Sequence, residues 1–116
     1  MSNFKDNNER LNQLLEQGKA MDAFELFYAE NVTMQENETE PRLGKDFNRE
    51  QCGGFVATFP DLKLQVMSVA YGEDLSIQEV LFDYTNEEGR KIVYPEIVVR
   101  HWENGLVIQE KFYYNG

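Results

Sequence analysis

Residues 90–114, which read RKIVYPEIVVRHWENGLVIQEKFYY, decide the fold. Two apolar-rich runs, Lys91 to Trp102 and Leu106 to Tyr114, flank the tripeptide Glu103-Asn104-Gly105. An Asn-Gly pair between two such runs is the strongest short-range signal for a β-hairpin, because both residues tolerate a positive φ. One face of this hairpin combines aromatic side chains with carboxylates. The stretch therefore predicts a pair of strands that lines a pocket.

The length of the hairpin turn decides which residues share that face. A two-residue turn would pair Glu103 with Leu106, whereas a three-residue turn with Gly105 in a left-handed bulge would pair Trp102 with Leu106. In both registers Ile108, Glu110, Phe112 and Tyr114 share a face. The first register adds Pro95, Ile97, Val99 and His101 to it, and the second adds Tyr94, Glu96, Val98, Arg100 and Trp102, because a one-residue slip reverses the face of a strand.

Upstream of the hairpin, the pattern predicts helices first and strands afterwards. Apolar residues at helical spacing indicate helices over 4–15, over 20–29, and from Gly44 to Phe59. Alternation indicates a strand over 32–37 and, after Asp61, strands over 62–71, 75–85, 91–102 and 106–114 with short turns between them. A chain of 116 residues has room for one domain, 1–116. We expect an α+β fold in which three N-terminal helices pack on one face of a curved, mostly antiparallel sheet.

The charge balance argues against several classes of partner. Eleven Lys and Arg residues against 21 Asp and Glu residues give a net charge of -10. Such a chain repels phosphate backbones and anionic lipid heads, so we expect no nucleic acid and no membrane partner. The chain has no apolar run of bilayer length, and its polar start lacks the hydrophobic segment of a secretory signal. We therefore expect a cytoplasmic location.

Metal and nucleophile chemistry have little support in the sequence. Cys52 is the single cysteine and His101 the single histidine, so the sequence cannot build a zinc cluster of these residue types. No Asp-x-Asp-Gly loop organises the glutamates for a hard cation. Under the second register His101 points away from the predicted pocket. We expect no metal and no cofactor.

The mixed hairpin face has two interpretations. Glu96, Arg100 and Glu110 can form a cross-strand charge cluster on a solvated or dimeric surface. Alternatively, Glu110 and Glu96 lie in a partly dry cavity, where desolvation and mutual repulsion raise the pKa of at least one carboxyl group. The sequence leaves both open.

The stretch that joins the second predicted helix to the third resembles a known family. The segment Phe27-Tyr28-Ala29-Glu30-Asn31-Val32-Thr33-Met34-Gln35-Glu36, followed by Glu40-Pro41-Arg42-Leu43-Gly44-Lys45, resembles the nuclear-transport-factor-two-like superfamily, especially its SnoaL-like (polyketide-cyclase-like) and steroid-isomerase-like branches. The order of elements also agrees, down to the Trp-x-x-Gly turn and the final Phe-Tyr-Tyr. The resemblance covers almost the whole chain. It implies a cone-shaped, cystatin-like fold with a pocket for a small hydrophobic ligand, and a homodimer formed through the outer face of the sheet.

The resemblance also implies site residues. In the isomerase-like branch a carboxylate at the end of the first strand acts as general base, and Glu36 occupies that position. The pocket-lining positions of the family fall on Tyr94, Glu96, Trp102, Glu110, Phe112 and Tyr114, which favours the second hairpin register. The tyrosine that polarises a carbonyl in that branch corresponds to about Leu11, and its protonated acid to about Val98. Because these oxyanion donors are missing, the steroid isomerase activity of that branch is not expected.

Two functional hypotheses follow. In the first, the pocket binds a small hydrophobic organic molecule, such as a carbonyl compound, and Glu36 or Glu110 carries cofactor-independent isomerase-like or cyclase-like acid-base chemistry, with Tyr94, Glu96, Trp102, Phe112 and Tyr114 in contact with the ligand. In the second, the protein is a non-catalytic module whose own aromatics fill the cavity and whose outer sheet face serves only association. The volume of the cavity distinguishes the two.

Overall fold

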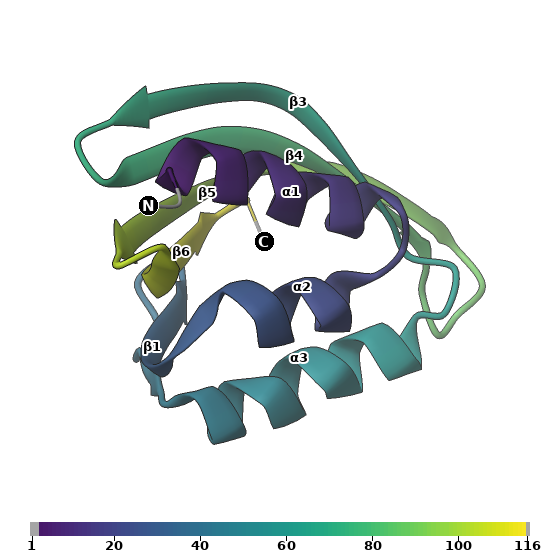
Figure 1. Cartoon of the computed structure of the whole chain (residues 1–116). Helices are drawn as coiled ribbons and strands as arrows, with labels where there is room; N and C mark the ends of the chain where they lie inside the picture. The colour runs from purple at the N-terminus through teal and green to yellow at the C-terminus, as the bar shows by residue number, and fades with distance from the viewer. Residues whose placement is uncertain (1–2, 116) are drawn as a thin grey trace.

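Three helices lie on the inner side of a curved sheet (Figure 1). The computed structural model describes residues 3–115. The elements along the chain are α1 (Phe4–Glu16), α2 (Ala20–Phe27), β1 (Tyr28–Glu36), β2 (Arg42–Leu43), α3 (Lys45–Thr58), β3 (Lys63–Gly72), β4 (Leu75–Thr85), β5 (Lys91–Glu103) and β6 (Leu106–Tyr113). The predicted α+β architecture, with helices first and a mostly antiparallel sheet, is confirmed. Within residues 3–115, no helix is long and apolar enough to cross a membrane.

The sheet has the strand order β2-β1-β6-β5-β4-β3. Strands β3 to β6 form the expected antiparallel meander, and β1 joins it by pairing parallel to β6. Strand β2 was not predicted. It consists of only two residues, too few to show an alternating pattern, and it places Arg42 opposite Met34 on β1.

The helix ends follow from local chemistry. After α1, Gly18 takes a φ of +77°, the amide of Gly18 donates to the carbonyl of Leu15, and the amide of Lys19 donates to that of Leu14. This is the Schellman pattern, in which a glycine ends a helix and turns the chain. Helix α2 ends at Phe27, two residues earlier than predicted, because Tyr28 is already extended, with φ -100° and ψ 135°. Tyr28 therefore begins β1 and pairs with Val107.

The hairpin between β5 and β6 differs from the preferred prediction. Asn104 and Gly105 both have positive φ, and Glu103 pairs with Leu106, so the turn has two residues and not three. A β-bulge follows at once, because Trp102 pairs with Val107 while His101 pairs with Gln109. The extra residue in β6 brings Arg100 opposite Glu110 and Val98 opposite Phe112. The predicted turn is therefore wrong, yet the predicted inner face is correct beyond the bulge.

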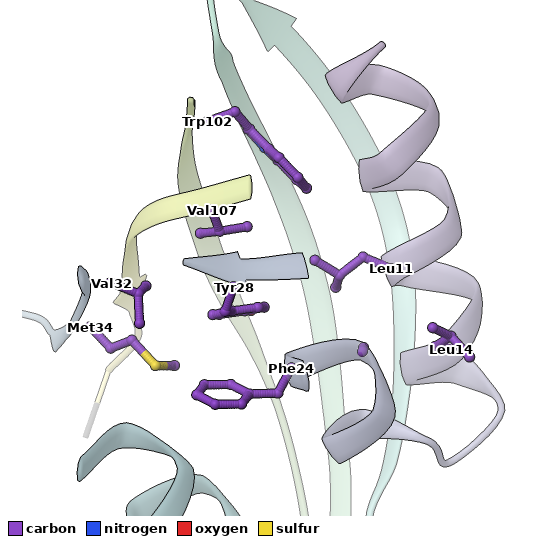
Figure 2. Close-up of a cluster of buried hydrophobic side chains, with 9 residues drawn as sticks. Leu11, Leu14, Phe24, Tyr28, Val32, Met34, Trp102 and Val107 are labelled. Carbon is purple, nitrogen blue, oxygen red and sulfur yellow. The ribbon is translucent and has the colours of Figure 1, made fainter. Parts of the chain in front are cut away.

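One hydrophobic cluster joins the first two helices to β1 and the hairpin (Figure 2). Its buried members are Leu11, Leu14, Ala23, Phe24, Tyr28, Val32, Met34, Trp102 and Val107. Trp102 lies at one end of the cluster, where its ring packs 6.2 Å from that of Phe4 on α1. Burial of such side chains is the main driving force for packing α1 and α2 against the sheet.

A buried polar layer, formed by Asn8, Asn12, Ser76, Gln78 and Arg100, also fixes α1 to the sheet. The Oδ1 atom of Asn8 accepts from Ser76 Oγ at 3.0 Å and from Arg100 Nη1 at 2.7 Å. Asn12 and Gln78 exchange two amide hydrogen bonds of 3.0 and 2.8 Å. Since buried polar groups are costly without partners, this layer sets the position of α1.

The polar layer can be tested by removing one acceptor. Asn8→Ala should lower the free energy of unfolding by about 2–4 kcal/mol, because Ser76 and the buried Arg100 guanidinium both lose a partner. Glu9→Ala, on the exposed side of the same helix, should change it by less than about 0.5 kcal/mol. Urea denaturation followed by circular dichroism measures both. Equal effects of the two substitutions would contradict the structural role that we assign to the layer.

Candidate functional site

A cavity of about 450 Å³ lies between the helices and the inner face of the sheet. This volume falls within the range of small-molecule sites, roughly 300–1,000 Å³. The cavity is thus open and not filled by its own aromatic side chains. Its apolar wall includes Leu15, Met21, Phe24, Met34, Phe55, Leu62, Leu64, Val80, Phe82, Val98 and Phe112.

The structure brings most of the predicted site residues to this cavity. Its lining includes Glu36, Tyr94, Glu96, Glu110, Phe112 and Tyr114. Trp102 does not line it. That side chain is only 3 % exposed, and its Nε1 donates to Ser76 Oγ at 3.0 Å. The sequence placed Trp102 on the correct face, but α1 covers that end of the hairpin, so the predicted contact of Trp102 with a ligand has no support.

Glu110 is held in a buried ion pair. Its Oε2 atom accepts from Arg100 Nε at 2.7 Å and from the Tyr28 hydroxyl at 2.5 Å, and the Arg100 and Glu110 side chains are each 2 % exposed. Burial and the charge of Glu110 raise the pKa of Tyr28 well above its usual value, so this hydroxyl stays a donor. The arrangement fixes Glu110 as the counter-ion of Arg100. The sequence analysis did not identify Tyr28 as a partner of Glu110. Tyr28 lies on β1 because α2 ends at Phe27, earlier than predicted.

Glu36 is also paired with a cation. Arg42 Nη1 contacts Glu36 Oε2, and the two side chains are 31 % and 21 % exposed for Glu36 and Arg42. Asn48 holds this arginine, because Arg42 Nε donates to Asn48 Oδ1 at 3.1 Å and Asn48 Nδ2 donates to the Arg42 carbonyl at 3.0 Å. Glu36 therefore lies in the partly exposed part of the cavity lining with its charge matched. Its predicted role as general base stays a prediction.

Glu96 differs from both other cavity carboxylates. It is 4 % exposed, and no Lys or Arg of residues 3–115 lies within ion-pair distance of it. Burial raises the pKa of Glu96 to about 7, the charges of Glu36 and Glu110 act in the same direction, and a hydrogen bond with Tyr94 opposes them. Glu96 can therefore gain and lose a proton near neutral pH.

Three aromatic side chains line the same cavity as Glu96, and two of them, Tyr94 and Tyr114, lie next to it. We call Phe82, Tyr94 and Tyr114 the aromatic wall. Tyr94 stacks on Phe82 of the neighbouring strand, with centroids 5.6 Å apart and planes at 14°, and lies 5.8 Å from the ring of Tyr114. Tyr114 directly follows Tyr113, which pairs with Ile97, so Tyr114 reaches the strand position beside Glu96. Its amide donates to Asn37 Oδ1 at 3.0 Å, which ties this end of the chain to the β1 end.

Other reactive side chains contribute little to the cavity. Burial raises the pKa of Cys52 to about 12, so the thiol stays protonated and is a poor nucleophile. His101 is not among the lining residues. Within residues 3–115, no group of three His, Cys, Asp or Glu side chains is arranged to hold a metal ion.

The environments of Glu96 and Glu110 predict opposite effects of the same substitution. Between about pH 4.5 and 7 the folded protein retains a proton on Glu96 that the unfolded chain releases, so stability falls as the pH rises, and the full cost is present above pH 7. Glu96→Gln should therefore raise the free energy of unfolding at pH 8 by about 2–3 kcal/mol and leave it nearly unchanged at pH 4.

Glu110→Gln serves as the matched comparison. It should lower the free energy of unfolding by about 3–5 kcal/mol at pH 8, because Arg100 is left buried without its counter-ion. Denaturant titrations at both pH values measure the two variants. If Glu96→Gln destabilises the protein at pH 8, the desolvation cost that we assign to the ionised Glu96 carboxylate is refuted.

Solved structures with the same fold share little sequence with this chain. A candidate SnoaL-like polyketide cyclase from Mesorhizobium loti superposes with a TM-score of 0.80 at 20% identity, over 97% of this chain and 100% of that chain. An NTF2-like protein of unknown function from Burkholderia pseudomallei gives 0.85 at 12% identity, over 99% and 92%. An uncharacterised cystatin-fold protein from Novosphingobium aromaticivorans gives 0.80 at 12% identity, over 97% of each chain. At these identities the likeness establishes the fold alone.

The family assignment comes from the sequence model of the SnoaL-like domain. No curated protein matches the chain. The SnoaL-like domain model matches residues 9–110, which include every cavity carboxylate and the bulged hairpin, and it confirms the resemblance found in the sequence. The chain therefore belongs to the SnoaL-like domain family.

Proposed function

We propose that this protein binds a small, largely apolar organic molecule in the cavity and exchanges a proton with it at Glu96. The observation that carries the proposal is a buried carboxyl group without a cationic partner in an open, mostly apolar cavity. Titratable groups with strongly perturbed pKa values in a cleft are typical of functional sites. A pKa of about 7 suits such a group, because general acid-base catalysis is most effective when the pKa of the group is near the working pH.

Isomerase-like or cyclase-like chemistry fits this arrangement. An ionised Glu96 accepts a proton from a carbon next to a carbonyl group and returns it to another atom of the same molecule. Leu11 and Val98 are buried apolar residues at the positions where the steroid-isomerase-like branch has its oxyanion donors. We therefore expect proton exchange at a modest rate, without a strong oxyanion hole.

The proposal moves the acid-base role from Glu36 and Glu110 to Glu96. Each of the other two carboxylates already has an arginine as its ion-pair partner. In this proposal Glu110 has a structural role as the ion-pair partner of Arg100, and the Glu36–Arg42 pair is a polar contact in the cavity lining. Membership of the SnoaL-like domain family is compatible with cyclase-like chemistry as one form of this function.

A flat bicyclic ketone, 2-tetralone, tests the proposal. The protein should accelerate exchange of its α-hydrogens with deuterium from the solvent, with a rate that rises through an apparent pKa of about 7 as Glu96 ionises. Glu96→Gln should lower the protein-dependent rate at least tenfold, and Glu36→Gln should leave it within about threefold. Proton NMR follows the exchange. Unchanged exchange in the Glu96 variant would refute the proposal, and loss in the Glu36 variant alone would favour Glu36 as the base.

We also propose that a second copy of this chain covers the outer face of the sheet. Ile77, Val93, Ile97 and Tyr113 are exposed there, on the side away from the cavity. Glu79 pairs with Ile97 across strands and Lys111 with Val99 on this face, so a twofold contact can bring charges of opposite sign together around an apolar centre. This arrangement leaves the cavity accessible.

Sedimentation equilibrium at 10–100 µM protein tests the dimer. Ile97→Glu should give a monomer, because it buries an unpaired charge at the centre of the interface. Leu26→Glu, at an exposed apolar position on α2, is the matched control and should stay dimeric. A monomeric wild-type protein would contradict this assembly.

A further inference from the structure

We propose that the cavity selects organic cations, so that its ligand is a hydrophobic amine whose ammonium group lies between Glu96 and the aromatic wall. The inference rests on the proposed function, because it requires that the cavity take up a small molecule. It adds the charge of that molecule, which the volume and apolar walls of the cavity leave open. For an ammonium ligand Glu96 is the counter-ion and not the base, so the inference depends on ligand uptake and not on proton exchange.

The charge balance of the lining carries the first step. Two arginines line the cavity, and each is already bound to a carboxylate, Arg42 to Glu36 and Arg100 to Glu110. The lining thus has three carboxylates for two cations, and Glu96 is the carboxylate left over among the described residues. An anionic ligand would meet repulsion from Glu96 and find both arginines occupied. A cationic ligand would supply the counter-ion that Glu96 lacks among the described residues.

The aromatic wall carries the second step. A cation is attracted to the electron-rich face of an aromatic ring, most strongly where water is excluded. The ring of Tyr94 contacts both Phe82 and Tyr114. Tyr94 and Tyr114 are the members of the wall that lie next to Glu96. Burial and the nearby carboxylates raise the pKa of both tyrosines, so their rings stay neutral phenols. A carboxylate next to two neutral aromatic rings is a combination of groups that recognises an alkylammonium ion.

Binding of an amine should therefore be linked to the proton on Glu96. At pH 8 the ionised carboxylate is ready for an ion pair, whereas at pH 6 the amine must displace a proton first. Other charged and titratable groups face Glu96 or line the same cavity; the arginines among them are paired, and the tyrosines and the thiol stay protonated in this pH interval. These groups are Tyr28, Glu36, Arg42, Cys52, Tyr94, Arg100, Glu110 and Tyr114.

Three compounds with one carbon skeleton test the inference. They are 2-aminotetralin, which is cationic at pH 6 and 8, the neutral 2-tetralol, and tetralin-2-carboxylate, which is anionic. Isothermal titration at pH 8 should give an affinity for the amine at least tenfold above that for the alcohol, with the carboxylate the weakest of the three. At pH 6 the advantage of the amine should be about tenfold smaller than at pH 8, because only about a tenth of Glu96 is ionised there.

Variants locate the effect. Glu96→Gln should reduce the affinity for the amine to that for the alcohol, while the affinity for the alcohol changes by no more than about twofold. Glu9→Gln removes the same charge from the exposed side of α1 and should leave the preference intact. Tyr94→Leu should lower the affinity for the amine more than the affinity for the alcohol. Circular dichroism checks that each variant is folded.

The outcomes separate this inference from the proposed function. If 2-tetralol and 2-tetralone bind and the amine is not preferred at pH 8, the inferred selection of cations is overturned and the proposed function is not affected. No binding of any tetralin would refute both. An equal loss of preference in the Glu9 and Glu96 variants would assign the attraction to the overall charge of -10 and would overturn the inference.

Discussion

The structure depends on the buried ion pair between Arg100 and Glu110. Its two side chains lie on β5 and β6, and their hydrogen bonds extend to Tyr28 on β1 and to Asn8 and Asn12 on α1. A buried pair of this kind is tolerated only when its remaining hydrogen-bonding groups are satisfied. The pair therefore dictates polar residues on the side of α1 that faces the sheet, where an amphipathic helix would normally present apolar ones.

The ion pair in turn requires the β-bulge near the turn. The two-residue turn pairs Glu103 with Leu106, and without a bulge that register would continue to Arg100 opposite Gln109 and Val99 opposite Glu110. Glu110 would then lie on the outer face, away from Arg100, because successive side chains point to opposite sides of a sheet. The extra residue in β6 reverses the alternation. The bulge thus allows both the two-residue Asn104-Gly105 turn and the ion pair between Arg100 and Glu110.

The sequence predicts those parts of the structure that depend on local pattern. Helical spacing located three helices, alternation located the long strands, and the aromatic and carboxylate face of the hairpin located most of the cavity lining. The two-residue β2 and the bulge could not be foreseen, because neither has a local pattern of its own. The same holds for Tyr28 and Arg42 as partners of Glu110 and Glu36, whereas a charge cluster that includes Arg100 and Glu110 was one of the two interpretations of the hairpin face. Arg42 reaches Glu36 only through β2, and Trp102, although on the predicted face, is covered by α1.

The three cavity carboxylates show how environment assigns different roles to one residue type. Glu110 has its arginine partner in the interior, and Glu36 has its own in the partly exposed lining. Glu96 carries a desolvation cost that a glutamine at the same position would not carry. The overall stability of a domain is only about 5–15 kcal/mol, so a cost of about 2–3 kcal/mol at one side chain is a substantial part of it. A buried group that lowers stability, lies in an open cavity and titrates near neutral pH is better explained by what it does to a ligand than by what it does for the fold.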